Sequence, residues 1–440
     1  MIVQIDEDVL RTIQNRTLAD YAGRYLRIGQ DFLENVRETG IELAPATGDQ
    51  ILQRRDALME MGATVRNNSK SVVFNCISSA CEACQTGVGS QTFFISLRCH
   101  RTCFYCFNPN QMDFDQYREN LRDPAAELQQ MHKAGHKLHT LALTGGEPLL
   151  YKDKAYEFFR TARRLYPDAH LRLYTCGDHA DEATLKELRD AGLTEIRFSI
   201  RLHDPETGWR HVYERIALAK QYIPQVMVEM PVFPGTFETM KEILRELDRL
   251  GLYSINLLEL CYPYFNAEAF RERGFTVKNP PHRVLYDYWY AGGLPIAGSE
   301  EVCLDLVQFA IEEGMTMGVH YCSLENKHTG QLYQQNAERK LPATTRFSQH
   351  DYFLKSAKAF GPDIKRVQRV FRKQGFKNYV VNDKYKFIEF PVEQIPALQE
   401  LDIEVGISSS VVEFRGGESY IRELKVDLTT PRQFDLAVDC

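Results

Sequence analysis

The chain has 440 residues, which predicts two or three domains at about 100–200 residues each. A hydrophobic content of 44% and a charged content of 26% are typical of a globular protein, and a net charge of −7 disfavours a general nucleic-acid-binding surface. No apolar run approaches the roughly 20 residues that a membrane helix needs, and the acidic N-terminus lacks a signal-peptide pattern. We therefore expect a cytoplasmic protein with no nucleic-acid or membrane partner.

Residues 1–75 are predicted to form a helical N-terminal region, because apolar side chains recur there at near-helical spacing. Those side chains are Leu10, Ile13, Leu18, Tyr21, Tyr25 and Leu26. Packing against the next domain is the expected role, and recognition of a partner is the alternative.

Residues 76–90 are predicted to be a cysteine-bearing linker. Cys76, Cys81 and Cys84 are spaced C-x4-C-x2-C, and six of the chain's 11 cysteines lie between Cys76 and Cys106. In a large intracellular protein such clustering indicates metal ligation rather than disulfides. Zinc, a second iron–sulfur cluster and plain thiol packing all remain open for the linker.

Residues 91–330 alternate apolar strands with amphipathic helices, which predicts a parallel sheet. The strand candidates are Thr92–Leu97, Leu138–Leu143, His170–Thr175, Glu195–Ile200, Gln225–Met230 and Ser254–Leu260. The helix candidates are Ala125–Ala134, Ala155–Leu165, Asp181–Ala191, Trp209–Gln221, Glu238–Leu250 and Val302–Glu313. Glu229 and Asn256 are polar residues on strand candidates, and either could face inward toward a substrate.

Residues 351–440 are predicted to form a small α+β domain of unassigned function. Its helix candidates are Asp363–Gln374 and Val392–Leu401, and its strand candidates are Asn378–Val381, Phe387–Phe390, Glu404–Phe414 and Ser419–Leu428. The last two strands are expected to pair around a turn at 415–418.

Cys99, Cys103 and Cys106 form a C-x3-C-x2-C array just after the first strand candidate. Three thiolates on one short loop can hold three irons of a cubane cluster and leave the fourth iron open to another ligand. A zinc site is the alternative, although zinc sites usually close with four ligands and pair their cysteines as C-x2–4-C.

A second motif, Gly145-Gly146-Glu147, ends the next strand candidate. Two glycines let the backbone approach a ligand closely, and Glu147 offers an acceptor for an ammonium group. A tight turn is the simpler reading of the motif alone.

Together the array and the Gly-Gly-Glu motif resemble the radical S-adenosylmethionine (radical SAM) superfamily. The resemblance implies a partial (β/α)6 TIM-like barrel and a [4Fe–4S] cluster on Cys99, Cys103 and Cys106. It also implies that Tyr105, Gly145, Gly146 and Glu147 lie at the S-adenosylmethionine site. Ser199 and Arg201 correspond to residues that hold the cofactor's carboxylate, whereas Cys176 stands where relatives often have asparagine.

A narrower resemblance rests on Cys81-x2-Cys84 and on His320-Tyr321-Cys322-Ser323. These residues resemble a group of proteins related to pyruvate formate-lyase activating enzyme, which implies no particular substrate. We expect Cys76, Cys81, Cys84 and Cys322 to meet in one four-thiolate site, which suits a second [4Fe–4S] cluster or zinc equally in ligand type.

The sequence therefore predicts a radical SAM enzyme that cleaves S-adenosylmethionine to a 5′-deoxyadenosyl radical and abstracts hydrogen from a peptide or protein side chain. A one-electron donor such as flavodoxin or ferredoxin is the expected partner. The alternatives are a glycyl-radical-enzyme activase-like protein and a zinc-stabilised, non-catalytic binding protein.

Overall fold

A computed structural model describes residues 1–46, 50–286 and 293–440. The chain divides into two compact units. The described parts of 39–281 and 288–330 form the barrel unit, and those of 1–38, 282–287 and 331–440 form the terminal unit. The two cysteine groups singled out in the sequence both lie in the barrel unit.

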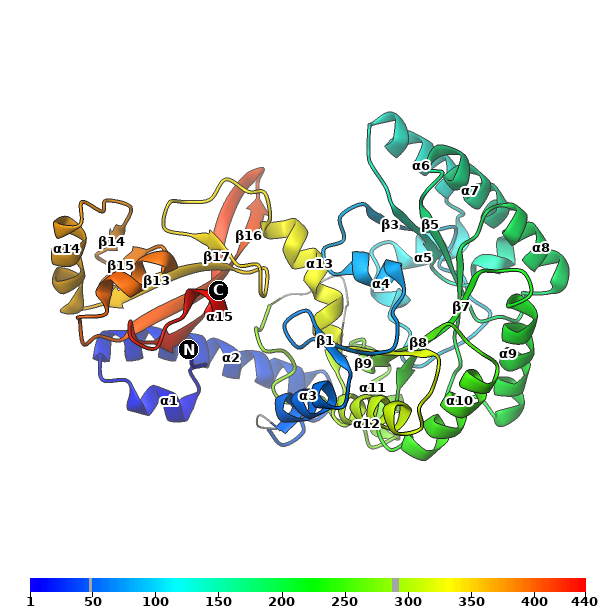
Figure 1. The fold of residues 1–440 in the computed structure, drawn as a ribbon, viewed down its shortest axis with the longest axis horizontal. Coiled ribbons are helices and arrows are strands. Elements are labelled where there is room, and N and C mark those ends of the chain that lie inside the picture. Colours follow the sequence, from blue (N-terminus) through cyan, green and yellow to red (C-terminus); the bar gives the residue numbers. More distant parts are fainter. Residues whose placement is uncertain (47–49, 287–292) are drawn as a thin grey trace. The chain divides into compact units, whose positions relative to one another are not determined.

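The barrel unit is built on one sheet, to which the described residues contribute nine strands in the order β1-β2-β11-β8-β7-β6-β5-β4-β3 (Figure 1). The strands are β1 Thr64–Arg66, β2 Ser71–Phe74, β3 Ser90–Phe94, β4 Thr140–Thr144, β5 His170–Thr175, β6 Glu195–Phe198, β7 Gln225–Val232, β8 Ser254–Glu259 and β11 Gly318–Cys322. β3 to β8 pair in parallel and in chain order, which confirms the six predicted strands of a partial barrel.

Three further strands widen the sheet beyond that prediction. β11 pairs in parallel with β8, while β2 and β1 add antiparallel strands from the N-terminal side of the array. Residues 64–74 therefore form strands within the region predicted to be helical. A two-stranded sheet of β9 Cys261–Tyr262 and β10 Leu294–Pro295 completes the strands of the unit's described part.

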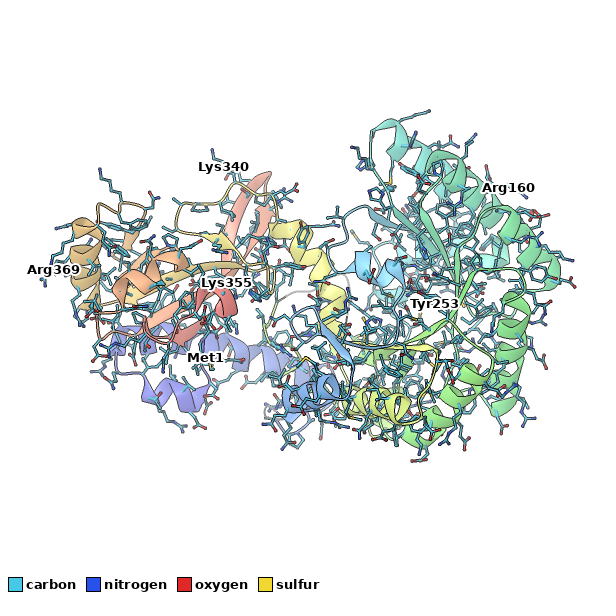
Figure 2. All side chains as sticks on the ribbon, in the orientation of Figure 1. Met1, Arg160, Tyr253, Lys340, Lys355 and Arg369 are labelled. Carbon is cyan, nitrogen blue, oxygen red and sulfur yellow. The ribbon has the colours of Figure 1, made fainter. Side chains whose placement is uncertain are left out.

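Amphipathic helices cover the outer face of the sheet, as the strand–helix alternation predicts. They are α6 Pro124–Lys133, α7 Lys152–Leu165, α8 Glu182–Asp190, α9 Glu206–Ala219, α10 Phe237–Arg249 and α12 Ser299–Glu312. Asp181 caps α8 by accepting a hydrogen bond from the Thr184 amide. Apolar side chains of these helices and of the strands form one buried core, whereas Arg160 points outward from α7 (Figure 2).

Shorter elements complete the barrel unit. They are α3 Gln50–Glu60, α4 Ser79–Cys84, α5 Phe114–Glu119, α11 Ala267–Arg271, the first residues of α13 Leu324–Asn336, and the 3-10 turns η1 Asn108–Asn110 and η2 Pro148–Tyr151. α4 occupies the segment expected to be a linker. None of the helices in the described ranges is both long and apolar enough to span a membrane.

The terminal unit is an antiparallel α+β fold with strand order β14-β15-β13-β16-β17, and β12 pairs with β13. Its elements are α1 Glu7–Thr12, α2 Arg16–Glu38, β12 Arg346–Phe347, β13 Leu354–Phe360, α14 Asp363–Lys373, β14 Val380–Asn382, β15 Phe387–Phe390, η3 Val392–Leu398, β16 Val405–Arg415, β17 Glu418–Thr429 and α15 Leu436–Asp439. The helix predicted at 392–401 is a shorter 3-10 segment, since Pro396 lies inside it.

Candidate active site

The cysteine array lies on the loop that leaves β3. Cys99 is exposed and Cys103 and Cys106 are half-buried. Burial and the neighbouring Cys106 thiol raise the pKa of Cys103 to about 11, and the Cys99 thiol contributes in the same direction. The three sulfurs therefore lie close enough to repel one another as thiolates, a repulsion that bound iron would relieve. This donor set fits three irons of a cubane cluster.

The Gly-Gly-Glu motif packs directly against the cysteine loop. The Gly146 amide donates to the Ser96 carbonyl at 3.0 Å, and the Glu147 amide donates to the Arg98 carbonyl at 2.9 Å. A Cβ on residue 146 would lie 2.0 Å from the Arg98 carbonyl oxygen. Only glycine at 146 allows the two backbones to approach this closely.

The Glu147 carboxylate is buried and already well supplied with donors. It accepts hydrogen bonds from the Leu149 amide at 3.0 Å, the Thr175 hydroxyl at 2.8 Å and the Cys176 amide at 2.7 Å. A carboxylate offers roughly four acceptor positions, so three protein donors leave room for one more. The structure thus joins Glu147 to the end of β5 and leaves one acceptor position that could take an ammonium group.

Arg201 reaches the same region from the loop after β6. Its buried guanidinium donates to Asp204 through Nε and Nη2, both at 2.7 Å, while Nη1 finds no hydrogen-bond partner among the described residues. The charge of Arg201 acts to lower the pKa values of Cys99 and Cys103, against the larger effect of burial. The unpaired Nη1 therefore fits a carboxylate bound beside the cysteine loop.

Ser199 and Tyr105 also lie at this end of the barrel unit. The Ser199 amide donates to the Thr175 carbonyl at 3.2 Å, and the residue is half-buried. The Tyr105 ring makes edge contacts with Phe104, His203 and Phe233 at centroid distances of 5.1 to 5.6 Å. Tyr105 thereby belongs to an aromatic cluster behind the last two cysteines of the array.

A polar group that the sequence did not reveal lies next to the array. His100 Nε2, Cys176 Sγ and an Asp178 carboxylate oxygen all lie within 4.8 Å of one another. Burial and the nearby Glu147 carboxylate raise the pKa of the Cys176 thiol far above its ordinary value. Cys176 is therefore a packed, protonated thiol. The alternation of residues along β5 could have placed Cys176 at the strand end, but no local pattern singles out Asp178.

The second cysteine set is only partly brought together. Cys81 and Cys84 lie on α4 and Cys322 ends β11, and the charges of Cys84 and Cys81 add to burial in raising the pKa of Cys322 to about 12. Cys76 lies elsewhere: its Sγ donates to the Tyr253 carbonyl at 3.5 Å, beside Gly318 at the start of β11. Four residues of strand separate Gly318 from Cys322, which is about 13 Å. The structure therefore separates Cys76 from Cys322, with which it was predicted to share a site.

Comparison with known proteins identifies the domain that carries the array. The sequence model of the Radical SAM superfamily matches residues 93–247. A protein of Methanocaldococcus jannaschii named "Putative glycyl-radical enzyme activating enzyme" is 26% identical over 261 residues, which are 57% of this chain and 64% of that protein. The GTP 3′,8-cyclase of Nautilia profundicola is 31% identical over 115 residues, which are 26% of this chain and 35% of the cyclase. The chain thus spans less than two thirds of either relative.

Solved structures show a fainter similarity. SuiB of Streptococcus suis bound to its precursor peptide SuiA is 11% identical, with a TM-score of 0.40 over 57% of this chain and 52% of SuiB. Residues 93–247 of this chain therefore match the Radical SAM superfamily model, and they carry the cysteine array, the Gly-Gly-Glu motif and Arg201.

Proposed function

We propose that this chain reductively cleaves S-adenosylmethionine and uses the resulting radical on a peptide or protein side chain. The observation that carries the proposal is the pair of backbone hydrogen bonds, Gly146 to Ser96 and Glu147 to Arg98, that fixes the Gly-Gly-Glu motif against the cysteine loop. Cys99, Cys103 and Cys106 would hold a [4Fe–4S] cluster, which would supply the one electron needed to cleave the sulfonium to methionine and a 5′-deoxyadenosyl radical.

The chain's own residues would bind and orient the cofactor. Gly146 leaves space for close approach, Glu147 has one free acceptor position for the ammonium, and Arg201 Nη1 has an unused donor for the carboxylate. Glu147 would bind the ammonium group of the cofactor's methionine part, and Arg201 would bind its carboxylate. These two charge-assisted hydrogen bonds would hold the sulfonium in one orientation. Tyr105 and Ser199 would line the same site.

The substrate class rests on the relative from Methanocaldococcus jannaschii, whose name describes an enzyme that activates another enzyme. A protein substrate is the natural extension of that name to this chain, and an activase-like role on a glycyl-radical enzyme is the second candidate. We also propose a flavodoxin or ferredoxin as electron donor. All 11 cysteines, each among the described residues, are free thiols, which supports a reducing cytoplasmic location.

The test is anaerobic reconstitution with iron and sulfide, followed by dithionite and S-adenosylmethionine. The chain should release 5′-deoxyadenosine, and joint replacement of Cys99, Cys103 and Cys106 by Ala should abolish the release. Cys440→Ala, in the terminal unit, is the control and should leave it unchanged. Cleavage that survives in the triple variant contradicts the proposal, and zinc as the sole bound metal favours a non-catalytic binding protein.

We propose in addition that the second cysteine set binds a metal centre, either iron–sulfur or zinc. Its support is the convergence of Cys81, Cys84 and Cys322 from segments more than 230 positions apart in the sequence.

A further inference from the structure

The inner face of the sheet carries a continuous row of polar side chains. Alternate residues of a strand share a face, and the pairing register aligns Tyr174 with Arg197, Glu229 with Asn256, and Asn256 with His320. Members of the row are Arg172, Tyr174, Glu195, Arg197, Glu229, Asn256 and His320. Burying polar side chains on five neighbouring strands costs free energy unless they have hydrogen-bond or charged partners. The partners of this row therefore indicate its role.

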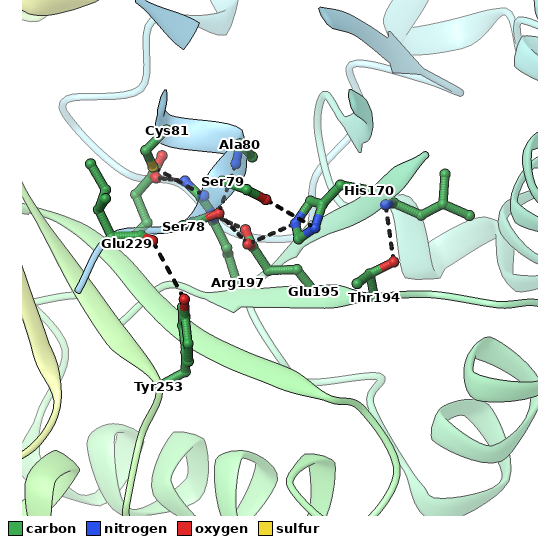
Figure 3. A network of polar contacts seen from close by, with 12 residues as sticks. Ser78, Ser79, Ala80, Cys81, His170, Thr194, Glu195, Arg197, Glu229 and Tyr253 are labelled. Atoms are coloured by element: carbon green, nitrogen blue, oxygen red, sulfur yellow. Dashed lines mark hydrogen bonds and ion pairs between the residues drawn. The ribbon is translucent and has the colours of Figure 1, made fainter. Parts of the chain in front are cut away.

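Helix α4 lies over this row (Figure 3). The Ser78 hydroxyl, which caps α4, donates to Glu195 Oε2 at 2.5 Å. Cys81, one turn further, places its Sγ 3.2 Å from Arg197 Nη2 and 3.2 Å from Asn256 Nδ2. α4 is therefore fixed to the inner face through a serine and a cysteine.

Arg197 and Asn256 are themselves held in place. Arg197 donates to Glu195 through Nε and to Glu229 through Nη1, both at 2.5 Å, and Asn256 Nδ2 donates to the same Glu229 oxygen at 2.7 Å. His320 Nδ1 lies 2.9 Å from Asn256 Oδ1, which fixes the amide orientation. Two buried N–H donors thus converge on one sulfur, an arrangement that suits a thiolate because a neutral thiol is a weak acceptor.

Three cations lie near Cys81 and Cys322. Arg172 and Arg197 act on Cys81, and Lys327 acts on Cys322 and Glu229. Cys322 accepts a further N–H···S bond from Asn326 Nδ2 at 3.2 Å.

We propose, as a deeper account of the second centre proposed above, that Cys81, Cys84 and Cys322 hold an iron–sulfur cluster on the inner face of the barrel. Arg197 and Asn256 are positioning residues that fix Cys81 and tune the cluster through N–H···S hydrogen bonds. Cys76, at the other end of β11, and Cys261, whose Sγ lies beside Gly293, are outside this proposed ligand set.

The ligand set is tested in the variant that lacks Cys99, Cys103 and Cys106, so that neither S-adenosylmethionine nor the first cluster is involved. After reconstitution about four irons per chain should remain, as for one cubane. Further replacement of Cys81, Cys84 or Cys322 by Ala should remove them, whereas Cys76→Ala and Cys261→Ala should not. The ligand set is overturned if the triple variant binds only zinc or no metal. It is also overturned if Cys76→Ala or Cys261→Ala removes the iron.

A second measurement covers the case in which the triple variant does not fold. In the otherwise unaltered chain, Cys322→Ala should lower iron from about eight to about four per chain while S-adenosylmethionine cleavage by the first cluster remains. If the chain does not cleave S-adenosylmethionine, this iron count is unaffected. An error in the proposed enzyme activity can therefore be told apart from an error in the proposed second cluster.

The positioning role is tested by reduction potential. N–H···S bonds stabilise the more negative reduced cluster, so Asn256→Leu should keep the iron and lower the midpoint potential of the second cluster in a redox titration followed by electron paramagnetic resonance. Ser254→Ala is the matched control, because Ser254 lies two residues earlier on the same face of β8 and its hydroxyl finds no partner among the described residues. Equal midpoint potentials of the second cluster in Asn256→Leu and in the unaltered chain would show that Asn256 does not tune the cluster.

Discussion

Arg101 and Asp178 form a two-point ion pair that connects the cysteine loop to the turn after β5. Arg101 Nε lies 2.7 Å from Asp178 Oδ2, and Arg101 Nη2 lies 2.6 Å from Asp178 Oδ1. His100, also in the loop, lies 2.6 Å from Asp178 Oδ2 through Nε2. Burial would raise the pKa of Asp178, but hydrogen bonds from Arg101 and His100 outweigh it and hold that pKa well below its ordinary value. Asp178 is therefore an ionised anchor for the loop that carries Cys99 and Cys103.

Asp178→Asn should loosen the cysteine loop without altering any thiol. Because the Arg101 side chain is 37% exposed, we expect a loss of only about 1 kcal/mol, which corresponds to roughly fivefold faster release of iron to a chelator. Glu187→Gln, which breaks the exposed Arg160–Glu187 pair, is the control and should change nothing. Equal release rates in the two variants would show that Asp178 does not anchor the loop.

Gly146→Ala should prevent the Gly-Gly-Glu motif from packing on the cysteine loop. The added methyl would lie 2.0 Å from the Arg98 carbonyl oxygen, and backbone cannot yield as a side chain does. We expect loss of S-adenosylmethionine binding in equilibrium dialysis and poor retention of iron. In Gly23→Ala the new Cβ has ordinary contacts of 3.7 Å or more, so that variant should behave like the unaltered chain. Normal cofactor binding by Gly146→Ala would contradict the close approach.

Glu147→Gln should weaken S-adenosylmethionine binding by about 10- to 150-fold, since a charge-assisted hydrogen bond contributes about 1.5–3 kcal/mol. The variant also disturbs the bonds from Leu149, Thr175 and Cys176, so a structural effect must be separated from a binding effect. Thr175→Val removes one of those donors and keeps the carboxylate. If Thr175→Val weakens binding as much as Glu147→Gln does, the role of Glu147 is structural.

Arg201→Gln should weaken S-adenosylmethionine binding more than it weakens binding of an analogue that lacks the carboxylate. The reason is that Arg201 Nη1 is the buried donor left without a partner. Comparing the two affinities by calorimetry isolates this contribution from any change in the Asp204 pair. A similar loss of affinity for both ligands would show that Arg201 has a structural role and does not bind the carboxylate.

The sequence predicted the barrel well because its strands are apolar and its helices are amphipathic, and both patterns are local. It missed β13, because Lys355 and Lys358 interrupt that strand. In the fold both lysines are buried and bonded to Ser409 and Ser408 of the neighbouring strand. Asp178 and Arg197 escaped notice because their partners lie 77 and 116 positions away. Cys76 was grouped by spacing with cysteines that the turn into α4 carries away from it.

The last prediction concerns acid stability of the barrel unit. Glu300 on α12 is buried and ion-paired with Arg55 and Lys278. Burial alone would raise the pKa of Glu300, but the charges of Lys278 and Arg55 lower it from 4.5 to about 2. Since the folded carboxyl releases a proton that the unfolded chain still binds below pH 4.5, its contribution is complete above that pH and is lost as the pH falls toward 2. The contribution is up to about 3 kcal/mol at 1.36 kcal/mol per pKa unit. Urea unfolding at pH 6 and pH 3.5 should show a smaller difference in Glu300→Gln than in the neighbouring control Glu301→Gln, and equal differences would contradict this account.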